Sequence, residues 1–191
     1  MLFRSTTIDR DGYNVLHVSM GSQSGTHVDA PLHFLPDGRA IDSYSPEVFM
    51  GEASIADATT VPKNTAIGPD LIPEPDAPGG IIVIRTDWSK HWAATDYLSH
   101  PFLSAEAAQR IIDVGFHVVA IDALSIDRTE GNIGDFPAHE ILLGAEVPIC
   151  ENLTNIAAVD WLKPWVSLLP LRIGSADGAP IRAVAFEFQH T

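Results

Sequence analysis

The sequence predicts a single α/β domain, residues 1–191, built around a mixed sheet. The run Gly80–Arg85 is continuously apolar and rich in β-branched residues, which is typical of a strand buried on both faces. A helical segment and a second apolar run, His117–Ile121, follow it, so that strand, helix and strand alternate. The 191 residues, 46% of them apolar, are enough to form one substantial core.

The N-terminal part contributes two more predicted strands. Asn14–Met20 alternates between apolar and polar residues and leads into a histidine-rich loop, and Ala53–Val61 reads as the next strand. The segment Pro62–Gly80 is rich in proline and glycine, so we expect a long irregular connection there rather than a linker between domains.

Two helices are predicted. The first covers Ser104–Val114, where Ser104 suits the N-cap position and Gly115 suits the C-terminal end. The second covers Asp135–Leu143, with Asp135 as its cap and Gly144 at its end.

The C-terminal part is predicted to return to strands. Val147–Glu151 is a short apolar run. Val166–Ile173 and Ile181–Phe188 read as two long strands joined by a turn of glycine, aspartate and proline. A strand–helix–strand order predicts a parallel pair with a right-handed crossover, so the whole sheet should be mixed.

Composition excludes several classes of function. Acidic residues outnumber basic ones by 25 to 11, and a net charge of −14 disfavours binding to nucleic acid. No stretch approaches the roughly 18 apolar residues of a membrane helix, and the N-terminus lacks the apolar core of a signal peptide. The single cysteine, Cys150, excludes an internal disulfide and predicts a reducing cytoplasm.

The segment from Gln23 to Phe34 is the strongest candidate for a functional site. Pro31 disfavours a helix and pushes the preceding residue toward an extended conformation. Residues two apart in extended chain project to the same side, so His27 and Asp29 point together. A turn after Pro31 could bring His33 back toward them, as a further ligand or a proton carrier. Imidazole and carboxylate groups aimed at one point suit a divalent metal; the alternative is a polar surface loop.

Two later residues could complete such a site. Glu151 ends an apolar strand, where a carboxylate is costly without a partner, and His139 lies on the short helix. A metal, an arginine or a helix N-terminus would each serve Glu151 as a partner. From spacing alone, a structural role for either residue is equally consistent.

The sequence resembles the cyclase family of metal-dependent hydrolases, which includes bacterial kynurenine formamidase and isatin hydrolase. That family carries His-x-Gly-Thr-His-x-Asp-x-Pro-x-His, and Gln23–His33 matches everything after its first histidine. His100–Ala108 is similar to the family's Pro-x-Leu-Ser-x-Glu-Ala-Ala helix start. Ile121–Asp127 is similar to its Asp-x-x-Ser-Ile-Asp strand end, and His139 followed by Glu151–Leu153 to its second metal-binding segment.

The resemblance implies a role for each matching residue. His27 and Asp29 would hold a first metal, while Asp29 and Glu151 would bridge to a second that His139 completes. His33 would be the general acid/base, acting with a metal-activated water. The implied fold is the family's swivelling β/β/α domain, assembled as a homo-oligomer, either a dimer or a tetramer.

The sequence departs from the family pattern in two places. Gln23 stands where the family has its first histidine, and an amide oxygen is a weaker ligand for zinc than for a harder ion such as manganese. The sequence therefore leaves open whether one or two ions bind. The family's upstream segment, with Asp-Leu-Ser and a Trp-Pro-Gly-like stretch, is expected to be missing or shortened. A kynurenine formamidase proper is therefore less expected than a hydrolase of another substrate.

Together these observations predict a cytoplasmic, metal-dependent hydrolase that cleaves an amide, formamide or cyclic amide C–N bond in a small molecule. The cofactor would be zinc or manganese, held by His27, Asp29, His139, Glu151 and Gln23, with His33 as the catalytic residue. Two alternatives remain at this stage: a lactone or ester hydrolase on the same site, and a metal-binding relative without catalytic activity.

Overall fold

The protein is built on an eight-stranded mixed sheet with the strand order β11-β3-β9-β8-β6-β4-β10-β12. The computed structural model describes residues 2–75, 79–131, 134–161 and 163–187.

The strands are β1 Leu2–Thr6, β2 Val15–Val18, β3 His27–Asp29, β4 Met50–Asp57, β5 Ala66–Ile67, β6 Ile81–Arg85, β7 Phe102–Leu103, β8 Val118–Ile121, β9 Ile149–Glu151, β10 Trp165–Ser167, β11 Gly178–Pro180 and β12 Val184–Phe186. The α-helices are α1 Ile8–Asp11, α2 Ala105–Asp113 and α3 Pro137–Gly144. Single 3-10 turns cover Pro31–His33, Ile41–Ser43, Pro46–Phe49, Pro69–Leu71, Trp88–His91, Tyr97–Ser99 and Ile156–Ala158.

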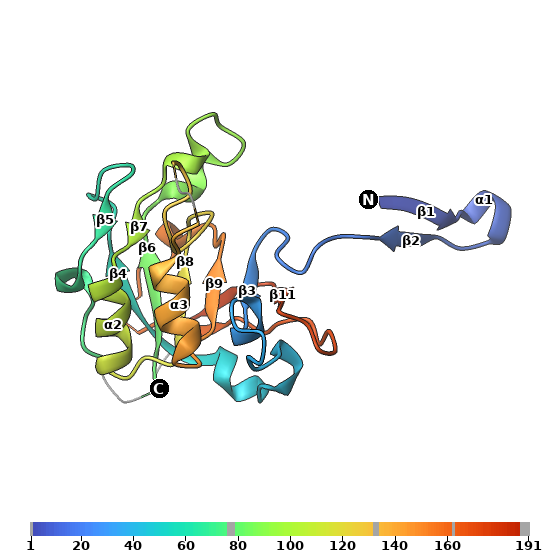
Figure 1. Cartoon of the computed structure of the whole chain (residues 1–191). Coiled ribbons are helices and arrows are strands. Elements are labelled where there is room, and N and C mark those ends of the chain that lie inside the picture. The colour runs from blue at the N-terminus through green and yellow to red at the C-terminus, as the bar shows by residue number, and fades with distance from the viewer. Residues whose placement is uncertain (1, 76–78, 132–133, 162, 188–191) are drawn as a thin grey trace.

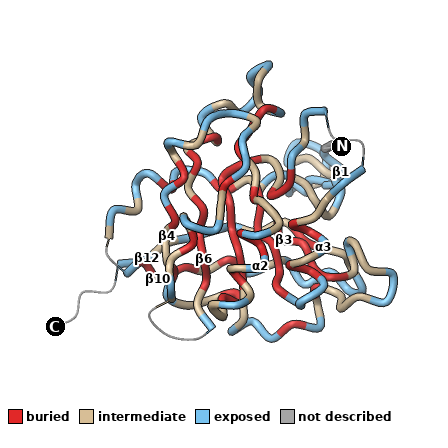
Figure 2. The backbone as a smooth tube through the Cα atoms, turned by 60° about the vertical axis from the view of Figure 1, so that its left-hand side comes forward, coloured by how far each residue is buried: buried red, intermediate tan, exposed pale blue. Residues whose placement is uncertain are grey.

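The centre of the sheet is parallel and its flanks are antiparallel. Strands β4, β6, β8 and β9 run parallel, whereas β3 lies antiparallel between β9 and β11. Both faces of β6 are covered, as its unbroken apolar sequence predicted, and Figure 2 shows the central strands as the most buried part of the chain. The α/β class with a mixed sheet is therefore confirmed.

Helices α2 and α3 lie side by side on one face of the sheet (Figure 1). The hydroxyl of Ser104 accepts a hydrogen bond from the backbone N–H of Ala107, and Gly115 follows the helix with a φ of +90°. Both ends of α2 thus follow the capping residues that the sequence predicted.

The start of α3 differs from the prediction. Asp135 was expected to cap this helix, but the N-cap position belongs to Phe136, whose side chain makes no capping bond. The carboxylate of Asp127 accepts hydrogen bonds from the backbone N–H groups of Ala138 and His139 instead, at 3.0 and 2.9 Å. A carboxylate brought in from an earlier segment satisfies the free donors of the first turn, so none is needed from the adjacent residue.

The C-terminal strands also differ from the prediction. The two long strands expected at 166–173 and 181–188 are instead three short ones, and Phe188 lies outside the described residues. Strand β10 pairs with β4 and β12 at one edge of the sheet, while β11 pairs with β3 at the other. Prolines at 170 and 180 lack the N–H that a continuous ladder needs, and only an isolated bridge joins Pro170 to Ile181.

Residues 2–20 stand away from the rest of the molecule. Strand β2 falls within the predicted range 14–20, but it pairs with β1 to form a separate two-stranded sheet. Figure 1 shows this hairpin, with α1 at its tip, projecting from the body on an extended connection.

Other boundaries shift by a few residues. Strand β4 begins and ends earlier than the predicted range 53–61, and the irregular connection 62–80 contains β5, which pairs with β7. Its residues 76–78 lie outside the described part. None of the helices described is long and apolar enough to cross a membrane.

Candidate metal centre and catalytic site

Strand β3 places two of the predicted metal ligands on one face of the sheet. Its alternation points His27 and Asp29 to the same side, while Val28 enters the core on the other side. In the antiparallel pairing of β3 with β9, His27 lies opposite Glu151. His139 reaches the same place from α3, and all four polar side chains are buried.

The four side chains form a compact cluster in which each carboxylate faces both imidazoles. The Nε2 atom of His27 lies 3.4 Å from Asp29 Oδ1 and 3.5 Å from Glu151 Oε2. The Nε2 atom of His139 lies 3.6 Å from Asp29 Oδ2 and 3.4 Å from Glu151 Oε1. One oxygen of each carboxylate therefore faces each histidine.

Hydrogen bonds behind the cluster fix both imidazoles. The Nδ1 atom of His27 lies 2.7 Å from the carbonyl oxygen of Gly25, and Nδ1 of His139 lies 2.7 Å from Asp127 Oδ2. Both partners are acceptors, so Nδ1 donates in each ring and Nε2 is directed at the carboxylates. Histidines that ligate metals are typically held in this way.

Burial and mutual charge shift the pKa values of the cluster. Burial lowers the pKa of His27, but its contacts with Glu151 and Asp29 outweigh burial and raise the pKa to about 8. Burial also lowers the pKa of His139, yet the carboxylates of Asp127, Asp29 and Glu151 raise it well above the usual value. The two histidines lower the pKa of Glu151 to about 2 against the effect of burial. Burial, and then the charge of Glu151, raises the pKa of Asp29.

The chemistry of these side chains fits a divalent cation. Among the residues described, both carboxylate oxygens of the fully buried Asp29 have no hydrogen-bond partner. A buried carboxylate without such partners is costly, and a cation is the partner that removes this cost. Two overlapping sets have ligating atoms within 4.8 Å of one another: His27, Asp29 and Glu151, and Asp29, His33 and His139.

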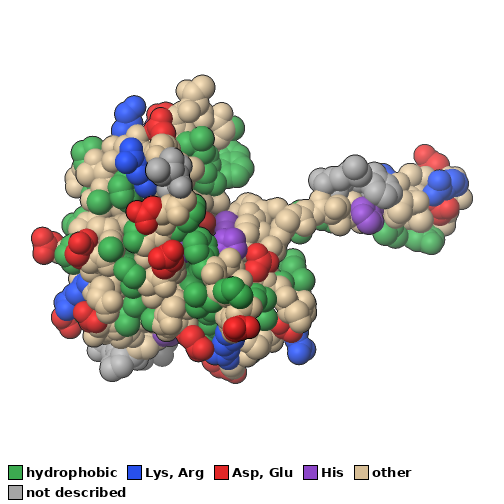
Figure 3. All heavy atoms as spheres, in the orientation of Figure 1, with side chains coloured by type: hydrophobic (Ala, Val, Ile, Leu, Met, Phe, Trp, Pro, Cys, Tyr) green, Lys and Arg blue, Asp and Glu red, His purple; other side chains and the backbone are tan. Residues whose placement is uncertain are grey.

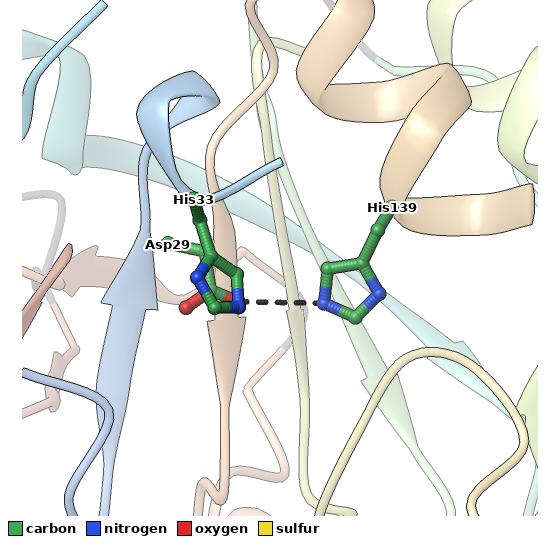
Figure 4. Close-up of side chains that lie close together, drawn as sticks. All are labelled: Asp29, His33 and His139. Atoms are coloured by element: carbon green, nitrogen blue, oxygen red, sulfur yellow. Dashed lines mark ion pairs between the residues drawn. The ribbon is translucent and has the colours of Figure 1, made fainter. Parts of the chain in front are cut away.

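His33 lies at the rim of the cluster rather than inside it. It ends the 3-10 turn that Pro31 begins, and 30% of its side chain is exposed. Figure 4 shows its ring and the ring of His139 approaching from opposite sides, with Asp29 behind the ring of His33 and paired with His139. The ring centroids of the two histidines are 6.1 Å apart. The predicted turn that brings His33 back toward Asp29 is therefore present.

Asp177 connects His33 to Gln23. Its Oδ2 atom lies 3.3 Å from Nδ1 of His33 and accepts a hydrogen bond of 3.1 Å from Nε2 of Gln23. Its Oδ1 atom accepts a 2.8 Å hydrogen bond from Ser22. The amide oxygen of Gln23 is buried without a hydrogen-bond partner in the described part of the chain. Gln23 thus lies next to His33, where a ligand role for it stays a prediction.

A cavity of about 490 Å³ opens beside the cluster. Its lining residues are Gln23, His27, His33, Phe34, Leu124, Ser125, Phe136, His139, Glu151 and Asn152. Figure 3 shows histidine side chains at the surface of the body where the N-terminal hairpin leaves it. The ring of Phe34 stacks on His139 with centroids 4.6 Å apart, and Phe136 packs edge-on against Phe34. The cavity therefore combines the polar cluster with an aromatic wall.

Sequence reasoning missed the two aspartates that hold the histidines. Asp127 was noted only as the end of a similar motif, and Asp177 was not singled out. Both meet their histidines through contacts that local pattern does not reveal. Asp177 precedes Gly178, where a Cβ would come within 2.6 Å of the Gln23 side chain, but this close approach is visible only in the structure.

Comparisons with known proteins identify the family of the chain. Residues 4–128 match the Cyclase family, described as "Putative cyclase". The chain is 30% identical over 183 residues to a protein named kynurenine formamidase from Bacillus cytotoxicus, covering 94% of this chain and 84% of the relative. The protein of the same name from Bacillus mycoides is 30% identical over 173 residues, covering 90% of this chain and 79% of the relative.

Solved structures support the same grouping. A potential metal-dependent hydrolase with cyclase activity is 27% identical, with a TM-score of 0.80 over 99% of this chain and 88% of that one. Isatin hydrolase A from Labrenzia aggregata, at 24% identity, shares the fold with a TM-score of 0.84 over 97% of this chain and 82% of that one. The family match and the relatives together show that this chain belongs to the cyclase family.

Proposed function

We propose that this protein is a metal-dependent hydrolase that cleaves an amide, formamide or cyclic amide C–N bond. The observation that carries the proposal is the buried cluster of two imidazoles and two carboxylates, open to a cavity with a partly exposed histidine at its rim. The relatives named kynurenine formamidase support an acyl–nitrogen bond as the target.

His27, Asp29, His139 and Glu151 would hold the metal, and Gln23 would add an amide ligand from the rim. When bound, the cation would polarise the carbonyl group and lower the pKa of a water molecule. Nitrogen and oxygen ligands of this kind suit zinc or manganese. Because each carboxylate offers one oxygen to each histidine, the arrangement favours two adjacent positions for a cation.

His33 would move the proton. Its Nδ1 atom faces the carboxylate of Asp177, which leaves Nε2 directed at the cavity. From that position Nε2 can take a proton from the attacking water and return it to the departing nitrogen. The carboxylate of Asp177 would orient the ring and stabilise its protonated form, a positioning role rather than a direct contact with substrate.

The cavity indicates the size and character of the substrate. Its volume of about 490 Å³ suits a small molecule. Phe34, Phe136 and Leu124 give it an apolar side, which suits a ring or short apolar chain next to the scissile bond.

Metal analysis combined with a substrate panel tests the function. The panel contains formamides, isatin-like lactams, cyclic imides, lactones and simple esters. We expect bound divalent metal, turnover of at least one amide-type substrate, loss of turnover on chelation, and a loss of about 10²–10⁴-fold in kcat for His33→Ala. His91→Ala, which changes a histidine outside the cavity, is the matched control. Turnover that survives chelation would overturn the metal role, and preference for lactones or esters would replace the amide assignment.

Assembly and location extend the proposal. We expect a homo-oligomer, either a dimer or a tetramer, as the family resemblance implies. The single, buried Cys150 suits a reducing cytoplasm. Fractionation of the source cells would test the location, and the mass in solution would test the assembly.

A further inference from the structure

Asn152 lies where the buried cluster meets the cavity, in a backbone conformation that few residues adopt. It follows Glu151, the last residue of β9, and it lines the cavity together with His33 and Glu151. Its φ of +57° falls in the left-handed region, which is strained for most residues other than glycine and which asparagine adopts more readily than most. Conformations of this kind cluster at functional sites, because the surrounding structure must hold them in place.

The backbone of Asn152 is held from both sides. Its N–H donates a 2.9 Å hydrogen bond to the carbonyl oxygen of Ala123, and its own carbonyl oxygen accepts a 2.7 Å bond from the hydroxyl of Thr26. Ala123 follows β8 and Thr26 precedes β3, and these are the two strands that flank β9 in the sheet. The position of Asn152 is therefore fixed by the same strands that carry the cluster.

The side chain of Asn152 is oriented by Tyr97, whose hydroxyl donates a hydrogen bond to Oδ1. Burial, and then the charges of Glu151 and Asp122, raises the pKa of Tyr97 to about 12, so this hydroxyl stays protonated and remains a donor. Tyr97 is itself anchored, because Nε1 of Trp88 donates a 2.9 Å hydrogen bond to its carbonyl oxygen. The amide oxygen of Asn152 is thus committed to Tyr97, and the amide nitrogen lies on the other side of the group.

This amide nitrogen keeps a hydrogen that the protein does not use. An asparagine amide carries two N–H groups. Within the residues described, the acceptor in reach of Nδ2 is the carbonyl oxygen of Leu124, at 3.5 Å, which is longer than an ordinary hydrogen bond and can occupy one N–H at most. Leu124 and Asn152 both line the cavity. The second N–H is therefore available to a molecule bound there.

We propose that the amide N–H of Asn152 donates a hydrogen bond to the carbonyl oxygen of the substrate, and that Tyr97 positions it to do so. The inference rests on the proposed hydrolysis and adds to it a donor from this chain. When water attacks the carbonyl carbon, negative charge develops on this oxygen. A donor that is already held in place stabilises the developing charge more than it stabilises the uncharged carbonyl group, and it therefore raises kcat.

A second asparagine shows what a purely structural role would require. Asn155 has the same left-handed conformation, with a φ of +62°, but it is exposed and is not among the residues that line this cavity. The conformation alone needs a residue that tolerates a positive φ, and glycine meets that need without strain. Asn152 differs from Asn155 in its bond from a tyrosine hydroxyl and in its place beside the cluster, and both features concern the side chain.

Kinetics on a matched pair of compounds test this role. The first is the panel compound that the unaltered protein hydrolyses fastest, and the second is its analogue with sulfur in place of the carbonyl oxygen. Sulfur is a poor hydrogen-bond acceptor, so the ratio of the two kcat values reports on donors to this atom.

The variants separate the amide N–H from the backbone. Asn152→Gly keeps the left-handed conformation without a side chain, whereas Asn152→Asp keeps an acceptor for Tyr97 and has no N–H. Tyr97→Phe removes the positioning hydroxyl. The control is Asn155→Gly, the same substitution in the same conformation outside the cavity. Circular dichroism and metal content verify that each variant is folded and loaded.

We expect kcat to fall about 10²-fold for Asn152→Gly and at least as far for Asn152→Asp, and the preference for oxygen over sulfur to shrink about tenfold in both. Tyr97→Phe should reduce kcat and this preference by a smaller factor, and Asn155→Gly should change neither.

If a folded, metal-loaded variant at residue 152 keeps the full preference for oxygen, the donor role is wrong while the proposed hydrolysis stands. If Tyr97→Phe changes neither kcat nor the preference, the positioning role of Tyr97 is wrong. If the unaltered protein hydrolyses no compound of the panel, the proposed function and this inference are both wrong.

Discussion

Asp127 holds His139 at two points: its Oδ2 atom lies 2.7 Å from the ring Nδ1 and 2.9 Å from the backbone nitrogen of the same residue. One carboxylate therefore starts helix α3 and orients a side chain that this helix delivers to the buried cluster with His27, Asp29 and Glu151. Helix stability and ligand geometry are coupled through this residue.

The substitution Asp127→Asn should weaken both the start of helix α3 and the binding of metal. The asparagine side chain has one acceptor oxygen where the aspartate has two, and it lacks the negative charge that stabilises the start of a helix. We therefore expect a loss of about 1 kcal/mol in the free energy of unfolding. Losing the oriented imidazole should weaken metal binding by about 10–100-fold. Calorimetric metal titration and thermal unfolding measure the two effects. Asp135→Asn, at the position expected from sequence to cap the helix, is the control and should change neither.

Asp177→Asn should impair turnover while sparing metal binding. The carboxylate faces Nδ1 of His33, so its loss removes orientation and charge from the proposed proton carrier. We expect kcat to fall roughly tenfold or more, less than for His33→Ala, with KM nearly unchanged. Metal content by elemental analysis should stay at the level of the unaltered protein. The control is Ser22→Ala, which removes only the hydrogen-bond partner of the other Asp177 oxygen and should have a small effect on kcat. If Asp177→Asn has the same kcat as the unaltered protein, the positioning role of Asp177 is wrong.

The metal-free protein should lose stability as pH rises from neutral. The pKa of His27 is about 8 in the folded state against 6.5 ordinarily. Because the pKa is higher in the folded state, protonation of His27 stabilises the fold. This contribution to the free energy of unfolding is about 2 kcal/mol; it is complete below pH 6.5 and is lost as pH rises through 8. The raised pKa of His139 extends the loss to higher pH. Bound metal replaces these protons, so the metal-loaded protein should keep its Tm.

Thermal unfolding of chelated and metal-loaded samples at about pH 6 and about pH 9 measures this difference. Metal-free His27→Gln lacks the group that titrates, so its Tm should fall less between the two pH values. A chelated sample with the same Tm at both pH values would contradict the prediction.

Local chemistry accounts for the parts of the structure that the sequence predicted. The unbroken apolar run of β6 and the Ser104 cap of α2 each depend on neighbours in the chain, and both are present. The alternation in β3 predicted that His27 and Asp29 share a face, and they do. In each case the decisive residues lie within one element.

The features that the sequence did not predict depend on contacts between distant segments. Asp177 meets Ser22 across 155 positions, and no periodicity links them. Asp127 displaced the expected cap Asp135 because the chain folds back to it through the loop before α3. The segment 14–20 reads as an ordinary strand entering the body, whereas β2 pairs with β1 in a separate two-stranded sheet.

Gly178→Ala should disturb the rim of the site through backbone crowding. A Cβ at this position would lie 2.5 Å from the carbonyl oxygen of Val28 and 2.6 Å from Nε2 of Gln23. Because the backbone contact cannot relax cheaply, we expect a loss of about 1–3 kcal/mol in the free energy of unfolding. Gly51→Ala, in β4, has nothing within 4 Å of the added carbon and serves as the matched strand control. Equal unfolding midpoints in urea for the two variants would contradict this account.

Gln23→His tests whether this residue sets the number of ions. An imidazole binds zinc more strongly than an amide does, so we expect more zinc per chain and tighter binding of the weaker ion. The substitution also removes the hydrogen bond from Gln23 to Asp177, which frees that carboxylate for His33 alone. Elemental analysis after dialysis against limiting zinc measures the stoichiometry, and Gln23→Leu, with no ligating atom, is the control. If the zinc content is the same for glutamine, histidine and leucine, residue 23 does not contribute to the metal centre, and its part is limited to the hydrogen bond that it donates to Asp177.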